Sequence, residues 1–194
     1  MRYNYNMDNF KDSDKVLFIP GWFDSGSFYS YRRHADIWEK NIDLEQDFHA
    51  DIIIAHSLGS AAALYNFNIH KQGKLVLINP VVSRKNLLIR WLQSMSHELP
   101  DNFWQRFYLL FFLAPAVIKA WKLLRLPSRQ IIKSIPSDKL LLVYGEKDRY
   151  LGERDLIDSA LLSEVAIIEL KGAGHNYGTI IDQALPGLIS KYLC

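Results

Sequence analysis

Three polar side chains that could act together each follow an apolar segment of the sequence. They are Ser57 in "IIIAHSLG", Asp148 in "VYGEKD" and His175 in "LKGAGH". A serine hydroxyl becomes a good nucleophile when a histidine takes its proton, and a carboxylate orients the imidazole and stabilises its charged form. Taken singly, the three residues also fit a helix cap, a turn and a loop. Taken together, they predict nucleophilic catalysis by Ser57, with His175 as base and Asp148 as the orienting acid.

The surrounding elements are predicted to bring these residues to one place. Buried strands are expected at Lys15–Pro20, Asp51–Ala55, Lys74–Asn79, Lys139–Tyr144 and Val165–Leu170. Helices are expected from Ser27 to about Lys40, at Leu58–His70, at Glu153–Leu162 and at Thr179–Tyr192. This alternation is typical of a parallel sheet with both faces covered, where chemistry occurs beyond the carboxyl ends of the strands. All three side chains follow a strand, so we expect them on one edge of the sheet.

Several motifs resemble those of a known family. "AHSLG" is similar to the nucleophile elbow G-x-S-x-G, and "GEKD" and "GAGH" resemble the family's acid loop and histidine loop. "LINP" resembles the common ending of the strand that lies between the elbow and the acid loop. With the chain order Ser, Asp, His, the sequence resembles a small α/β-hydrolase of the carboxylesterase type, truncated at its N-terminus. The resemblance implies one domain over residues 1–194 with a parallel sheet of about five strands, in the family order 3-5-6-7-8. Helices would flank this sheet. A helical lid would follow the third strand at about residues 81–138, and Asn41–Phe48 carries a weak signal for a further strand.

The family pattern also implies an oxyanion hole made of two backbone N–H groups. One would come from Leu58, after the nucleophile, and the other from Trp22 in "IPGWFDSG". The sequence departs from the family at Ala55, where the elbow has glycine, and at Pro20, where histidine is common. The alternative acid position after the third strand is Asn79-Pro80, which leaves Asp148 as the acid. His56 is expected to point away from Ser57 and to have a structural role.

The insertion between the third and fourth strands is rich in aromatic and basic residues. Its segment Asn102–Leu126 has helical character, with Pro115 near a bend, and its apolar face either packs on the core or lines an acyl pocket. Arg84–Lys133 contains only two acidic residues, Glu98 and Asp101. The partner-binding candidates are Arg84, Lys85, Arg90, Arg106, Lys119, Lys122 and Arg125, and Arg129 and Lys133 are also basic.

Two interpretations of this charge remain open. It is either a solvated helix surface or a surface for an acidic partner, namely a membrane surface or an acidic carrier protein that delivers an acyl chain. The "PGW" opening and the basic lid resemble hydrolases of biotin synthesis that cleave the methyl ester of pimeloyl on acyl carrier protein.

Composition narrows the function classes. The net charge is only +2, so it gives no argument for nucleic-acid binding, and Cys194 is the one cysteine, so no intrachain disulfide can form. No metal-binding or nucleotide-binding motif is found, so neither a metal nor a cofactor is expected. The polar N-terminal residues lack the apolar core of a signal peptide, so a cytoplasmic location is expected. The sequence therefore predicts a serine carboxylesterase for an ester with a hydrophobic acyl part. A binding module with the same fold, or an acyltransferase with the same triad, is the alternative.

Overall fold

The frame of the chain is a parallel β-sheet. The structure of the chain is a computed structural model, and it describes residues 11, 13–21, 31–35, 45, 47–87, 89–90, 93, 114–149, 151–154 and 164–193. Five strands lie in the order β1-β2-β3-β4-β5, and each neighbouring pair is parallel. They are β1 (Val16–Ile19), β2 (Ile52–His56), β3 (Lys74–Ile78), β4 (Leu140–Gly145) and β5 (Ala166–Leu170). The predicted contiguous parallel sheet is confirmed, and its carboxyl ends form a single edge.

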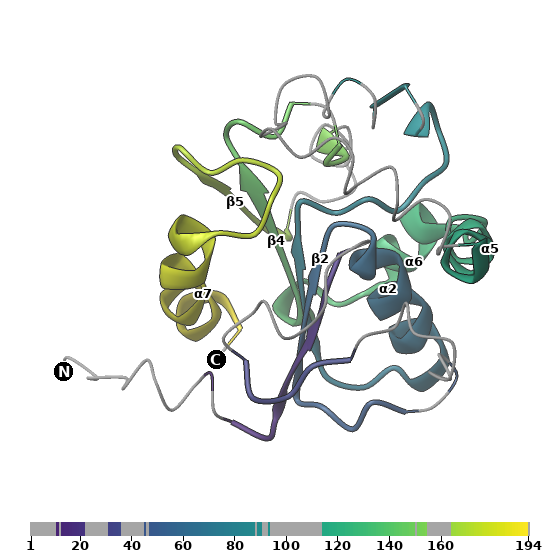
Figure 1. Cartoon of the computed structure of the whole chain (residues 1–194). Coiled ribbons are helices and arrows are strands. Elements are labelled where there is room, and N and C mark those ends of the chain that lie inside the picture. Colours follow the sequence, from purple (N-terminus) through teal and green to yellow (C-terminus); the bar gives the residue numbers. More distant parts are fainter. Residues whose placement is uncertain are drawn as a thin grey trace, which may run out of the picture.

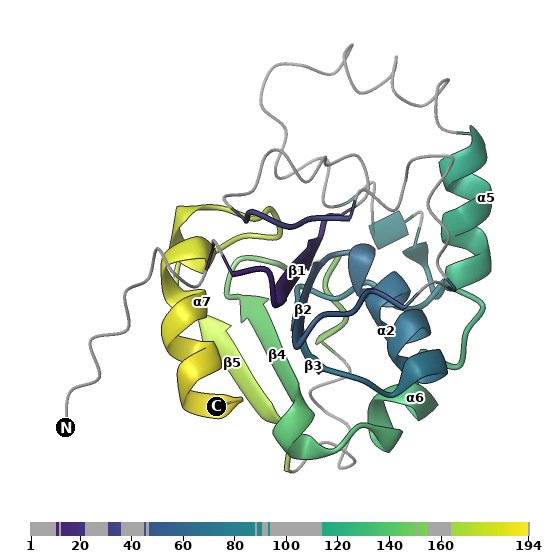
Figure 2. The same ribbon diagram turned by 90° about the horizontal axis from the view of Figure 1, so that it is seen from below.

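Both faces of the sheet are buried under helices. Leu75 and Leu77 of β3 face one core cluster, whereas Val76 and Ile78 face the other. Helices α2 (Gly59–His70), α5 (Ala114–Leu123) and α6 (Ser128–Ser134) lie on the first side, and α7 (Thr179–Tyr192) covers the second (Figures 1 and 2). Because β1 to β4 are buried on both faces, these strands are continuous apolar runs rather than alternating ones, whereas the edge strand β5 is half-buried and exposes Glu169.

Helix α2 lies close to the sheet because its first turns carry small side chains. Its buried positions include Gly59, Ser60 and the alanines at 61–63. A Cβ atom on Gly59 would lie 2.4 Å from the carbonyl oxygen of Pro20 and 2.7 Å from that of Ile19. Glycine at this position therefore lets the start of α2 approach the end of β1, as the elbow motif predicts.

Residues 31–35 correct one helix prediction. They were expected within a helix from Ser27 to about Lys40, but they run beside β1, with a parallel bridge between Phe18 and His34. The Phe18 N–H donates to the Arg33 carbonyl at 3.0 Å, and the Ala35 N–H donates to the Phe18 carbonyl at 2.9 Å. This pairing satisfies backbone groups that β1 would otherwise leave open at the edge of the sheet. Amphipathic spacing gave no sign of that need. The other residues of the predicted helix lie outside the described part.

The insertion contributes to the helical layer over the sheet. In α6, Ile131 and Ile132 are buried in the same core cluster as α2, and a 3₁₀ turn (Ser137–Lys139) then leads into β4. Residues 94–113 lie outside the described part, so the lid over residues 81–138 stays a prediction. The same holds for most of the helix expected at Glu153–Leu162 and of the weak strand expected at Asn41–Phe48. In the described part of the chain, no helix has the length and apolarity needed to cross a membrane.

Candidate active site

The three predicted side chains meet at the carboxyl edge of the sheet. Ser57 directly follows β2, Asp148 lies in the loop after β4, and His175 lies in the loop after β5. The Ser57 Oγ is 2.8 Å from the His175 Nε2, and the His175 Nδ1 is 2.7 Å from the Asp148 Oδ2. His175 is 4% exposed and Asp148 1%. Since a carboxylate only accepts hydrogen bonds, Nδ1 carries a proton and Nε2 is free to accept the one from Ser57.

Ser57 occupies a sharp turn between β2 and α2. Its φ of 52° lies in the left-handed region, which is costly for a residue with a side chain. Three backbone hydrogen bonds hold the turn: the Ser57 N–H donates to Ile78 at 2.8 Å, and the Ser57 carbonyl accepts from Ser60 and Val81, both at 3.1 Å. Ala55, where the family has glycine, is fully buried in the core cluster under α2. Its extra methyl group therefore packs without opening the turn.

Two backbone N–H groups complete the surroundings of Asp148. Gly152 donates to Oδ2 at 3.0 Å and Leu151 donates to Oδ1 at 3.2 Å. Burial favours the neutral acid, but the hydrogen bond and charge of His175 and the two N–H donors outweigh it, so the pKa of Asp148 lies below its ordinary value. A Cβ atom on Gly152 would lie 2.4 Å from Oδ2, so only glycine allows this approach.

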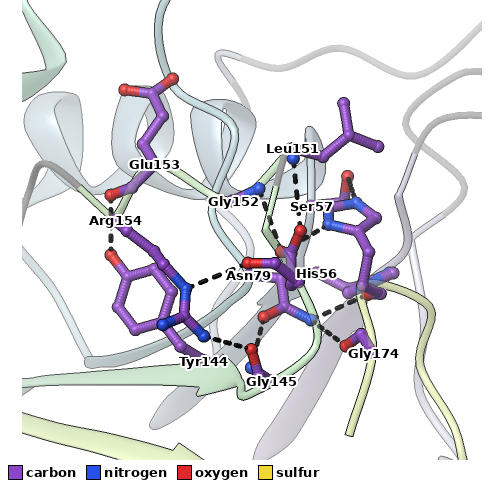
Figure 3. A network of polar contacts seen from close by, with 12 residues as sticks. His56, Ser57, Asn79, Tyr144, Gly145, Leu151, Gly152, Glu153, Arg154 and Gly174 are labelled. Carbon is purple, nitrogen blue, oxygen red and sulfur yellow. Dashed lines mark hydrogen bonds and ion pairs between the residues drawn. The ribbon is translucent and has the colours of Figure 1, made fainter. Parts of the chain in front are cut away.

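Asn79 is a site residue that the sequence analysis treated only as the absence of an acid. It follows β3 and is completely buried, with a φ of 45°. Its Oδ1 accepts from the Gly145 N–H at 2.7 Å, and its Nδ2 donates to the carbonyls of Gly174 at 2.9 Å and His175 at 2.8 Å. Figure 3 shows its side chain between Gly145 and Gly174. Its place directly after a buried strand, at the same edge as the other three, was the available signal.

His56 also contacts the histidine loop rather than Ser57. It is 1% exposed, and its Nε2 lies 2.8 Å from the His175 carbonyl oxygen. Because a carbonyl oxygen only accepts, the His56 Nε2 carries the proton. The structural role expected for His56 agrees with this contact, but its partner, the backbone of the predicted base, was not foreseen.

Arg90, one of the predicted partner-binding residues, points inward to the acid loop. It donates to Glu153 Oε1 at 3.4 Å, to the Lys85 carbonyl at 3.2 Å and to the Leu151 carbonyl. Glu153 is buried, and its Oε1 also accepts from the N–H groups of Val82 at 2.9 Å and Ser83 at 2.6 Å. The first residues of the insertion are thereby tied to the loop that holds Asp148.

The other predicted partner-binding residues lie mostly at the surface. Arg84, Lys85, Lys122 and Arg125 are exposed, and Lys119 is half-buried. The Arg84 guanidinium lies over the ring of Trp121, 5.0 Å from its centroid. Arg106 lies outside the described residues.

Of the two residues predicted to form the oxyanion hole, only Leu58 lies in the described part of the chain. Within the described residues, the Leu58 N–H meets no hydrogen-bond acceptor, although Leu58 itself is 3% exposed. That N–H belongs to the residue directly after Ser57, the position at which the family pattern places an oxyanion donor. Trp22 lies outside the described residues. Among the residues that the structure describes, no cluster of histidine, cysteine or acidic side chains could hold a metal ion.

A tyrosine pair, Tyr31 buried and Tyr177 half-buried, supports the segment after His175. The Tyr177 hydroxyl donates to Asp182 Oδ1 at 2.9 Å and lies 3.2 Å from the Tyr31 hydroxyl. Burial raises the pKa of both tyrosines well above the ordinary value, so both hydroxyls keep their protons. Lys11 pairs with the other oxygen of Asp182, which links the start of the described chain to α7.

Comparisons with known proteins agree on the fold. No protein-family model matches the chain, and no curated protein matches it. Among solved structures, BpoC of Mycobacterium tuberculosis, named as a non-heme bromoperoxidase, is 14% identical with a TM-score of 0.61, and the match covers 94% of this chain and 92% of that one. A thermophilic esterase from Thermogutta terrifontis is 12% identical with a TM-score of 0.56, covering 92% and 90%.

A third structure, Est1E from Butyrivibrio proteoclasticus, is 12% identical with a TM-score of 0.55, and the match covers 94% of this chain and 89% of that one. These matches span nearly the whole chain. The chain therefore has the α/β-hydrolase fold.

Proposed function

We propose that this chain is a serine hydrolase that cleaves carboxylic esters with Ser57 as its nucleophile. The observation that carries the proposal is the hydrogen-bonded series from Ser57 Oγ through the His175 ring to Asp148, built on a serine with a φ of 52°. A left-handed serine between a strand and a helix is a strained arrangement, and such strain is concentrated at functional sites. A serine that only capped α2 would not need a buried imidazole and carboxylate behind it.

The chemistry follows from the proton positions. His175 Nε2 takes the proton of Ser57 as Oγ attacks the ester carbonyl, and the tetrahedral oxyanion is stabilised by the Leu58 N–H and, by the family pattern, by Trp22. The imidazolium then returns the proton to the leaving alcohol, so the C–O bond breaks and an acyl-enzyme remains. Water, deprotonated by His175, attacks the acyl group and releases a carboxylic acid and free Ser57.

The structural neighbours differ in the reactions that their names give. One of the three is an esterase by name, and the likeness in fold supports a search for hydrolysis among small esters first. Since one fold carries many functions, catalysis is inferred from the site residues themselves.

Covalent labelling tests the proposal. Wild-type protein treated with a fluorophosphonate should gain one adduct on the peptide that contains Ser57, and it should hydrolyse p-nitrophenyl esters of short acids. Ser57→Ala should lose both properties while keeping its far-ultraviolet circular dichroism. Labelling that survives Ser57→Ala, or no labelling of the folded wild type, would contradict the assignment. Ligand binding without turnover would favour the binding module, and ester formation with an added alcohol would favour the acyltransferase.

We further propose that the natural ester is delivered by an acidic partner, with acyl carrier protein as the first candidate. Four predicted residues, Arg84, Lys85, Lys122 and Arg125, are exposed, and α5 and α6 contain no acidic residue. Reversing these charges to glutamate should raise KM for an acyl-carrier ester several-fold and leave small esters unaffected, because steering acts on the partner alone. An equal change for both substrates would refute the carrier. Retention of the protein by anionic vesicles, lost in the same variants, would instead point to a membrane surface.

A further inference from the structure

The carbonyl oxygen of His175 accepts hydrogen bonds from two side chains, that of His56 at the end of β2 and that of Asn79 directly after β3. We propose that Asn79 is a positioning residue for the proposed hydrolysis. Together with His56, it fixes the backbone of His175 so that Nε2 faces the Ser57 Oγ. This inference rests on the proposed function for its kinetic readout, whereas its structural readout is independent of turnover.

Asn79 uses its whole carboxamide on the site. An amide has two N–H hydrogens and one carbonyl oxygen, and here the two hydrogens go to Gly174 and His175 while the oxygen accepts from Gly145. Gly145 begins the turn that leads to Asp148, and Gly174 leads to the base. One buried side chain thus joins the acid loop, 66 residues further along the chain, to the histidine loop, 95 residues further along.

The contact of His56 with the His175 carbonyl helps to set the distance between Ser57 Oγ and His175 Nε2. His56 precedes Ser57 directly, and both residues contact His175: His56 Nε2 lies 2.8 Å from its carbonyl oxygen, and Ser57 Oγ lies 2.8 Å from its Nε2. The separation of nucleophile and base is therefore set by two adjacent residues at the end of β2. Asn79 holds the same carbonyl from β3, so the histidine loop cannot pivot about one contact.

Asn79→Asp isolates this role. Aspartate has nearly the same shape and tolerates a φ of 45° as asparagine does, and one of its oxygens can still accept from Gly145. Its other oxygen would replace an N–H donor and face the carbonyl oxygens of Gly174 and His175. The substitution therefore turns two attractive contacts into repulsive ones and removes little else.

The experiment compares wild type, Asn79→Asp and Ile132→Ala. Ile132 lies on α6 in the core, so its truncation is a control that destabilises the fold without touching the site. We expect Asn79→Asp to lower kcat for a p-nitrophenyl ester about 10- to 100-fold with little change in KM, because small misplacements of a base carry such losses. We also expect the proton NMR resonance of His175 Nδ1–H, identified by its loss in His175→Ala, to broaden through faster exchange. Ile132→Ala should lower the unfolding temperature and keep both kcat and the resonance.

Two results would overturn the proposal. One is an Asn79→Asp protein with wild-type kcat and an unchanged Nδ1–H resonance. The other is recovery of activity when Asn79→Asp is added to Asp148→Asn, since that would place residue 79 at the imidazole rather than at the backbone. If folded wild type hydrolyses no ester, the proposed function fails, and the NMR comparison alone then decides the positioning role. A broadened resonance in Asn79→Asp would support that role, and an unchanged one would refute it.

Discussion

The carboxyl edge of the sheet and the insertion that follows β3 differ in how far their side chains are buried. At the edge, Asp148 and His175 are 1% and 4% exposed, and each is bonded to groups from other loops. On α5, in contrast, Ile118 is 60% exposed and Trp121 49%, among cations that lie in water.

The difference separates chemistry from access. A buried network holds the geometry that a proton transfer needs, because a low-dielectric setting strengthens each hydrogen bond and penalises each missing one. An exposed surface of one charge sign does little for stability and instead influences what approaches. Arg90 is the exception, since it belongs to the insertion but its side chain donates hydrogen bonds to the acid loop.

The largest effect should come from the edge itself. Asp148→Asn should leave the protein folded but lower kcat about 10⁴-fold, because an amide can hold the imidazole in the wrong tautomer. Steady-state hydrolysis of a p-nitrophenyl ester measures this, with circular dichroism as the check on folding. A loss below about tenfold would mean that Asp148 does not orient the base.

Two arginines of the insertion should behave differently. Arg90→Ala removes a donor to the buried Glu153 and to the Leu151 carbonyl, so we expect the free energy of unfolding to fall by about 2 kcal/mol. Since the acid loop loses its anchor, kcat should fall as well. Arg84→Ala, which removes an exposed cation from Trp121, should change stability by no more than about 0.5 kcal/mol. Urea unfolding compares the two variants, and equal losses would erase the distinction between the regions.

The smallest predicted effect is a pH dependence of stability. The pKa of Asp148 is lower in the folded state than its ordinary 3.8, so its ionised form favours folding. That contribution is fully present above the ordinary pKa and is lost as the pH falls below it, through the folded-state pKa. Between pH 6 and pH 2.5, wild type should therefore lose more stability than Asp148→Asn. Parallel curves from urea titrations would contradict the assignment.

The sequence predicted the sheet and the meeting of Ser57, Asp148 and His175 because both depend on local signals. Apolar runs mark the strands, and residues that follow parallel strands must share an edge. The contacts of Arg90 were not predictable in this way. Its partner Glu153 lies 63 residues away, and nothing in the spacing of charges distinguishes Arg90 from the exposed Arg84.

The edge pairing of residues 31–35 illustrates a second limit. Tyr31 and its neighbours have residue types compatible with a helix, but an open strand beside them decides their conformation. Asn79 was predictable in part. The sequence places it directly after a buried strand, but it does not indicate which groups its amide would contact.

The rate of phosphonylation tests the central claim most directly. A fluorophosphonate added to wild type and to His175→Ala, with the modified peptide identified by mass spectrometry, reports both which residue attacks and whether the imidazole activates it. We predict a single adduct on Ser57 in wild type and at least a 100-fold slower reaction in His175→Ala, about the lower bound for general-base assistance. An adduct on another residue, or equal rates in the two proteins, would contradict the account.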